Sequence, residues 1–102
     1  MNRLESLLEI LKKDENDTFS RYALALEYNS INETEKSKSE FLKLLNESPS
    51  YLPTYYQLGK MYESEGDIDE ALKIYTKGLY VASSQNDTHT KNELQEAIDN
   101  LY

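Results

Sequence analysis

Apolar residues recur at spacings of three and four along nearly the whole chain, which places them on one face of an α-helix. Leu4, Leu7, Leu8 and Leu11 form the first of these stripes. No run alternates apolar and polar residues long enough to indicate a strand, and the short polar connections predict antiparallel neighbours. The pattern therefore predicts an all-α fold with six helices, over residues 2–13, 17–30, 34–47, 52–65, 68–83 and 88–101.

The residues between the stripes are of the types that end and begin helices. Pro49 ends the third predicted helix, and Ser50 is placed to cap the fourth. Pro53 falls in the first turn of that helix, where its missing N–H costs nothing. Gly66 follows the fourth helix at a position for a left-handed residue, and Asn32 takes the corresponding position after the second.

These marks recur after 34 residues without a gap. The shift pairs Tyr22 with Tyr56, Leu24 with Leu58, Ala25 with Gly59, Tyr28 with Tyr62, Phe41 with Tyr75 and Leu45 with Leu79. Two helices in 34 residues is the period of the tetratricopeptide repeat (TPR). The second unit carries the motif most fully, as Tyr55-x-x-Leu58-Gly59-x-x-Tyr62 followed by Ala71-x-x-x-Tyr75. On these residues the chain resembles the TPR family.

The first unit departs from this pattern at three positions. Arg21 stands where an aromatic residue is usual, Ser37 where alanine is usual, and Leu44 where the second unit has Gly78. Ala25 in the first unit and Gly59 in the second are small residues that stand where the two helices of each unit must approach closely. The gapless period still favours the resemblance, because residue types recur in phase.

The flanks extend the array on both sides. At the N-terminal side, the same shift of 34 makes residues 2–13 the second helix of a unit whose first helix is absent. At the C-terminal side a shift of 36 is needed, and it aligns Leu58 with Leu94 of the last predicted helix. The resemblance implies a right-handed superhelix of helix hairpins, and the whole is similar to small stand-alone bacterial TPR proteins. We expect one domain over 1–102, divided into a half repeat 2–17, repeats 18–51 and 52–85, and a capping helix 86–102.

Composition excludes several classes of protein. The 102 residues are 38% hydrophobic and 29% charged, which is typical of a soluble globular chain. No apolar run approaches the roughly 20 residues that span a bilayer, the first five residues do not resemble a signal peptide, and no cysteine is present. We therefore expect a cytoplasmic protein. The net charge of −8, without a basic stripe, predicts no nucleic-acid partner and no membrane binding.

Arrangements for catalysis are not found in the sequence. His89 is the one histidine, on a polar helix face, and gives no transition-metal site by itself. The acidic clusters lie at predicted helix starts and lack the spacing of a calcium loop. The three glycines form no phosphate-binding loop. We expect no enzyme activity, no metal and no cofactor.

The resemblance implies that the first helix of each pair lines a shallow concave groove that binds a peptide or partner segment. The phase of these helices predicts groove residues Tyr22, Leu26 and Asn29, then Tyr56, Lys60 and Glu63, and from the capping helix Asn92, Glu96 and Asp99. In the alternative, Tyr22, Tyr56 and Leu26 are core side chains of neighbouring helices. Tyrosines beside acids favour a basic and apolar segment over an acidic tail, since only Lys60 could clamp a carboxylate.

A second function remains open, in which the chain is a self-associating scaffold. Leu4 and Leu8 widen the first stripe beyond what one neighbouring unit can cover. Such an apolar edge is typical of an association surface and predicts a weak two-fold homodimer. The competing prediction is a monomer, in which the first helix tilts inward and buries all its leucines.

Overall fold

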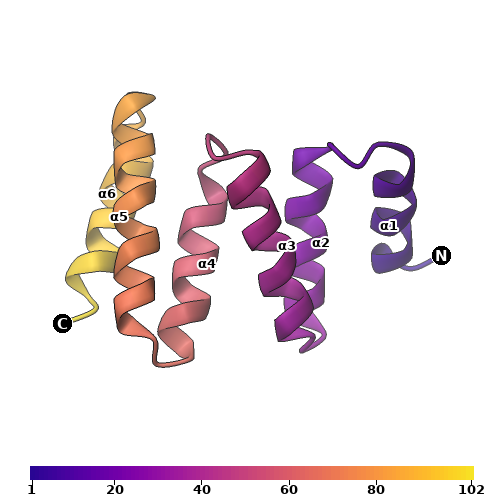
Figure 1. Ribbon diagram of the computed structural model, residues 1–102, viewed down its shortest axis with the longest axis horizontal. Helices are drawn as coiled ribbons and strands as arrows, with labels where there is room; N and C mark the ends of the chain where they lie inside the picture. Colours follow the sequence, from indigo (N-terminus) through magenta and orange to yellow (C-terminus); the bar gives the residue numbers. More distant parts are fainter. The chain divides into compact units, whose positions relative to one another are not determined.

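The computed structural model describes residues 1–102 and contains helices but no strand (Figure 1). The helices are α1 (Arg3–Lys13), α2 (Thr18–Ser30), α3 (Thr34–Glu47), α4 (Pro53–Ser64), α5 (Ile68–Ser84) and α6 (Thr88–Asp99). The predicted six helices are confirmed, with ends that differ by at most two residues. No helix combines the length and the apolar composition needed to cross a membrane.

The chain divides into two compact units, Met1–Tyr51 and Leu52–Tyr102. In the first unit α1 packs on α2 and α2 packs on α3. In the second unit α4 packs on α5 and α5 packs on α6. Each unit is therefore a series of three helices in which consecutive helices are neighbours.

All three helices of the first unit bury apolar side chains. Leu7 and Leu11 of α1 are buried against Ala23 and Leu24 of α2, as the stripe of apolar residues predicts. On α3, Phe41 is 1% exposed. Burial of these side chains is the main favourable term that holds short helices together, because isolated helices of this length are marginal in water.

The core of the second unit depends on one close helix crossing. Tyr75 of α5 is fully buried, and its ring lies directly on Gly59 of α4. A Cβ atom at residue 59 would lie 2.2 Å from Tyr75 Cε1, so only glycine fits there. The predicted close approach at Gly59 is confirmed. Leu94 and Ala97 of α6 complete this core.

Three left-handed residues close the helices that end in tight turns. They are Asn32 (φ 64°), Gly66 (φ 80°) and Asn86 (φ 57°). In each turn the next residue's N–H donates to the carbonyl five positions back, at 2.9 Å, which is the bond of a Schellman motif. Asp67 and Asp87 then cap α5 and α6 by accepting a backbone N–H. The left-handed residues Asn32 and Gly66 were predicted, whereas at Asn86 the sequence predicted a turn but not its left-handed conformation.

The start of α4 differs from the prediction. Ser50 does not cap this helix, because the residue before the helix is Leu52, which already has helical dihedral angles (φ −61°, ψ −39°). Pro53 is the first helical residue, as expected. The fixed φ of proline suits this position, so the helix begins without a side-chain cap.

Candidate functional site

The predicted face on α2 is built around Tyr22, which is half-buried. Its ring meets Phe41 of α3 edge-on, with 5.9 Å between centroids, and meets Tyr51 at 5.5 Å. Leu26, one turn further along α2, is also half-buried, and Asn29 is exposed. Two aromatic neighbours therefore hold the Tyr22 ring, while part of its surface faces solvent. Tyr22 is thus neither a pure groove residue nor a pure core residue, the two roles that the sequence left open.

On α4 the three predicted residues come together in one cluster. Tyr56, Lys60 and Glu63 are each half-buried. The ammonium group of Lys60 lies 5.5 Å from the centroid of the Tyr56 ring and 3.5 Å from Glu63 Oε2. The Tyr56 ring in turn lies 6.4 Å from the ring of Tyr75. An aromatic face, a carboxylate and a cation thus meet on the surface of α4.

Tyr75 connects this cluster to the core of the second unit. Its hydroxyl donates a hydrogen bond to Glu63 Oε1, at 3.4 Å, while its ring is fully buried. Burial raises the pKa of the Tyr75 hydroxyl, and the negative charge of Glu63 raises this pKa further. Tyr75 therefore stays a neutral hydrogen-bond donor. Glu63 Oε1 accepts from this hydroxyl, while Glu63 Oε2 pairs with Lys60. The sequence assigned Tyr75 only to the core, so its role at this site was missed.

The predicted residues on α6 form no comparable cluster. Asn92 and Glu96 are exposed, and Asp99 is exposed and accepts a hydrogen bond from Gln95 Nε2 at 3.0 Å. The start of this helix is also held by polar contacts. There Asp87 accepts the backbone N–H of Thr90 at 3.0 Å and the Thr90 hydroxyl at 2.9 Å.

The sequence marked Arg21 only as a departure from the repeat pattern and did not predict its ion pair with Glu40. Arg21 is 7% exposed, with Nη1 at 2.5 Å from Glu40 Oε1 and Nη2 donating to the carbonyl of Glu15 at 2.7 Å. The corresponding residues of the second repeat are Tyr55 and Ile74, both buried and uncharged. The sequence signal for this ion pair was that two residues of opposite charge, Arg21 and Glu40, stand in the first repeat where the second repeat has uncharged residues.

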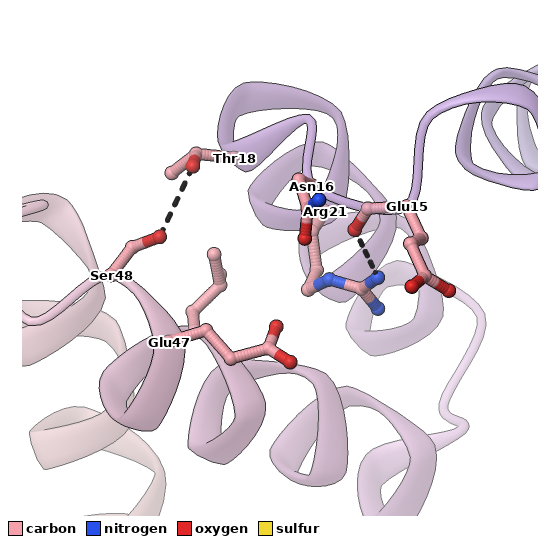
Figure 2. A pocket seen from close by; sticks show the side chains of 7 residues that line it. Glu15, Asn16, Thr18, Arg21, Glu47 and Ser48 are labelled. Atoms are coloured by element: carbon pink, nitrogen blue, oxygen red, sulfur yellow. Dashed lines mark hydrogen bonds between the residues drawn. The ribbon is translucent and has the colours of Figure 1, made fainter.

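A small open pocket of about 220 Å³ lies beside Arg21 (Figure 2). Its polar lining includes Glu15, Asn16, Thr18, Arg21, Glu47 and Ser48. The hydroxyls of Thr18 and Ser48 lie 3.1 Å apart across one side, and the guanidinium of Arg21 is held by Glu15 on the other. The structure contains no group of three or more histidine and acidic side chains that could hold a metal ion.

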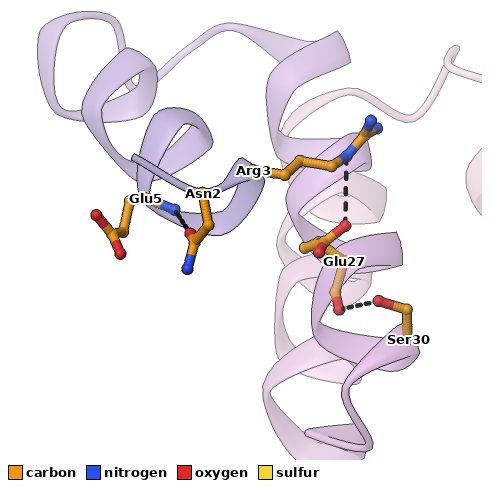
Figure 3. Close-up of polar contacts among 5 residues, drawn as sticks. All are labelled: Asn2, Arg3, Glu5, Glu27 and Ser30. Atoms are coloured by element: carbon orange, nitrogen blue, oxygen red, sulfur yellow. Dashed lines mark hydrogen bonds and ion pairs between the residues drawn. The ribbon is translucent and has the colours of Figure 1, made fainter.

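The two leucines of the predicted association edge lie in different surroundings. Leu4 packs against the core cluster shared by α1 and α2, whereas Leu8 is 43% exposed. Arg3 also ties the start of α1 to α2, through a 3.3 Å ion pair between its Nε and Glu27 Oε2 (Figure 3). The apolar edge that remains open on this side of α1 therefore centres on Leu8.

Tandem two-helix units with half-buried tyrosines at a recurring position define a helical-repeat protein. The sequence model described as tetratricopeptide repeat matches residues 52–85. A solved tetratricopeptide repeat domain protein from Salinibacter ruber is 35% identical to the chain, with a TM-score of 0.83. The likeness covers 86% of this chain and 89% of that one. The chain belongs to the tetratricopeptide repeat family.

Two further comparisons extend this result. The solution structure of a protein from Bordetella parapertussis has a TM-score of 0.83 and 24% identity, and covers 99% of this chain and 88% of that one, which shows the shared fold. The probable biofilm formation methyltransferase WspC of Pseudomonas putida is 38% identical over 48 residues. That match spans 47% of this chain but only 11% of WspC. Repeats of the family generally mediate protein–protein interaction, and the fold is typically non-catalytic.

Proposed function

We propose that this chain is an interaction module that binds extended or helical segments of another protein through the faces of its helices α2, α4 and α6. One observation carries the proposal. Both units present a half-buried tyrosine at the same repeat position, Tyr22 and Tyr56, on the first helix of a hairpin. Each ring rests near an aromatic residue of the following helix, Phe41 or Tyr75. These rings are arranged before any partner arrives.

Tyrosines held in this way favour a large gain in binding free energy. A tyrosine offers a large contact surface with few rotatable bonds, and a ring that is already held loses little further freedom on association. Aromatic residues of this kind are enriched among those that dominate binding free energies. We therefore expect Tyr22 and Tyr56 to contribute more to partner affinity than the exposed residues Asn29, Asn92 or Glu96.

The charge of the second unit favours a basic partner segment. Residues 52–102 hold four lysines and nine acidic residues, a net charge of −5 with His89 neutral. Lys60 is the one lysine on the predicted face, and it already contacts Glu63 and the Tyr56 ring. An acidic tail would therefore meet repulsion, whereas a segment with basic and apolar residues would be attracted.

A displayed library of random peptides tests the proposal without a known partner. Selection on the unmodified chain should enrich segments that combine basic and apolar residues. Tyr22→Ala and Tyr56→Ala should each weaken binding of these segments by more than about fivefold. Tyr80→Ala is the matched control, because Tyr80 is 76% exposed on α5 and outside the proposed faces. Equal losses in all three variants, or enrichment of acidic tails, would contradict the proposal.

The exposed Leu8 of α1 supports one alternative function, a scaffold that pairs through this helix. Leu8 is 43% exposed on a short amphipathic helix, beside the buried stripe of Leu7 and Leu11. Sedimentation at two protein concentrations decides between a monomer and a weak homodimer. Leu8→Glu is the more informative variant, since Leu4→Glu would also disturb the core that Leu4 contacts. A dimer that Leu8→Glu abolishes would support this alternative.

A further inference from the structure

The cluster on α4 has the composition of a binding site for a cation, and a side chain of the protein itself occupies it. The Tyr56 ring offers its negative face, and Glu63 offers a carboxylate oxygen beside it. The other oxygen of Glu63 accepts the hydroxyl of Tyr75, which is fixed because the Tyr75 ring is fully buried. The ammonium group of Lys60 is the cation that the site holds in the free protein.

Lys60 is held only weakly in this position. Its side chain is 40% exposed, and its 3.5 Å distance to Glu63 exceeds the roughly 2.7–2.9 Å of a strong charge-assisted hydrogen bond. Exposed pairs three residues apart on one helix contribute little to stability. A competing cation that makes better contacts can therefore displace Lys60 at small cost.

We propose that Tyr56, Glu63 and Tyr75 form a binding site for the guanidinium group of an arginine in the partner segment, from which Lys60 must first withdraw. The inference rests on the proposed function and specifies one side chain of the partner. A guanidinium is planar and weakly hydrated, so it stacks on the Tyr56 ring and donates to Glu63 at the same time. The ammonium of Lys60 is a strongly hydrated point charge that cannot stack in this way. Lys60 thus acts as an internal competitor that selects arginine over weaker cations.

The first unit has no equivalent of this site. Leu26 and Asn29 stand at the positions of Lys60 and Glu63, and Phe41 replaces the buried tyrosine, so the carboxylate and the hydroxyl donor are both missing. The face of α2 therefore suits an apolar side chain, whereas the face of α4 suits a cation. This asymmetry predicts that the arginine of a bound segment contacts α4 and leaves α2 to apolar residues.

The test is a titration of the full chain with N-acetyl-arginine N-methylamide, followed by NMR of the backbone amides and tyrosine rings. Lys60→Met removes the internal competitor and keeps a residue that favours helix. We expect this variant to bind the probe at least about threefold more tightly than the unmodified chain, with shifts at Tyr56. Adding Glu63→Gln to Lys60→Met should abolish the binding. Unchanged or weaker binding by Lys60→Met, or no shift at Tyr56, would overturn the inference.

Two controls make the result specific. Lys73→Met removes one positive charge from the exposed surface of α5, so it measures the effect of net charge alone and should leave the affinity unchanged. An N-acetyl-norleucine N-methylamide probe lacks the cation and should not bind. If selected peptides depend on Tyr22 and Tyr56 but Lys60→Met weakens them, the inference fails and the proposed function stands. If the arginine probe binds as expected but no peptide is selected, the proposed function fails instead.

Discussion

The guanidinium of Arg21 and the carboxylate of Glu40 form a partly buried ion pair between α2 and α3, at positions where the second repeat has Tyr55 and Ile74. The two hairpins therefore fill the same two positions differently, with an ion pair in the first and two buried uncharged side chains in the second. The second hairpin also needs a small neighbour, because a Cβ atom at Gly78 would lie 2.6 Å from Tyr55 Cβ. The first repeat therefore departs from the family pattern at linked positions: it has an ion pair in place of Tyr55 and Ile74, and it has Leu44 where the second repeat needs Gly78.

Breaking this pair from one side should be costly. The Arg21 side chain is 8% exposed and that of Glu40 is 21% exposed, so Arg21→Met would leave a carboxylate with little access to water. We expect Arg21→Met to lower the free energy of unfolding by about 3 kcal/mol, measured by urea denaturation. The double variant Arg21→Met/Glu40→Leu should recover most of that loss, because no buried charge remains unpaired.

The exposed pair of Arg3 and Glu27 provides the control for this experiment. The Arg3 side chain is 67% exposed, so water screens its interaction with Glu27. Arg3→Met should lower the free energy of unfolding by less than about 1 kcal/mol. Similar losses for Arg3→Met and Arg21→Met would show that the buried pair has no special structural role.

Gly59→Ala tests the close crossing of α4 and α5. Alanine favours a helix over glycine by about 1 kcal/mol, but its Cβ would lie 2.2 Å from the ring of Tyr75, which is fully buried in a close-packed core. Overpacking of this kind costs about 1–3 kcal/mol, so the net effect should be destabilising, and larger still for Gly59→Leu. Chemical denaturation measures this change. A stabilised Gly59→Ala variant would mean that the ring does not rest on residue 59.

Tyr75 should make the second unit sensitive to alkali. Burial, and then the charge of Glu63, raise the pKa of Tyr75 above its value of about 10 in the unfolded chain. The stability linked to this group is fully present below about pH 10 and is lost as the pH rises further. Tyr75→Phe should therefore move the midpoint of alkaline unfolding to higher pH. The exposed Tyr80→Phe is the control, and a larger shift from that variant would contradict the assignment.

Asp87 should make the start of α6 sensitive to acid. The backbone N–H of Thr90, and then the Thr90 hydroxyl, hold the pKa of Asp87 below the ordinary value of an aspartate. Its contribution to stability is present above the unfolded pKa and is lost as the pH falls through the folded one. An NMR titration of the carboxyl group should give a midpoint below that of an unstructured aspartate. Asp87→Asn should remove the acid-induced loss of amide protection at the start of α6.

The sequence was sufficient to predict the helices, because their signals are local. Spacing of apolar residues located each helix, and Asn32 and Gly66 marked two of the left-handed turns. The turn that contains Asn86 was predicted, but its left-handed residue was not, because the capping helix follows a shift of 36 that does not align Asn86 with Asn32 or Gly66. The pairing of Arg21 with Glu40 was also missed, since it depends on which side chains two different helices bring together.

The sequence also predicted those parts of the candidate site that lie on one helix, but not the contacts between helices. Helical phase placed Tyr56, Lys60 and Glu63 on one face of α4, and the structure brings these three side chains into contact. Phase alone gave no information on Tyr75, whose ring fills the core while its hydroxyl reaches Glu63. A residue with both roles is visible only when distances between helices are known. Asn92 has the predicted phase as well, but no ordered cluster surrounds it.

The most direct measurement of the central claim is a map of backbone amide chemical shifts when a library-selected segment binds the labelled full chain. We expect the largest changes on α2 and α4, around Tyr22 and Tyr56, with smaller changes on α6. Amides around Leu8 on α1 and Tyr80 on α5 should stay unchanged. A map confined to α1, or centred on the exposed side of α5, would contradict the assignment of these tyrosine faces as the binding surface.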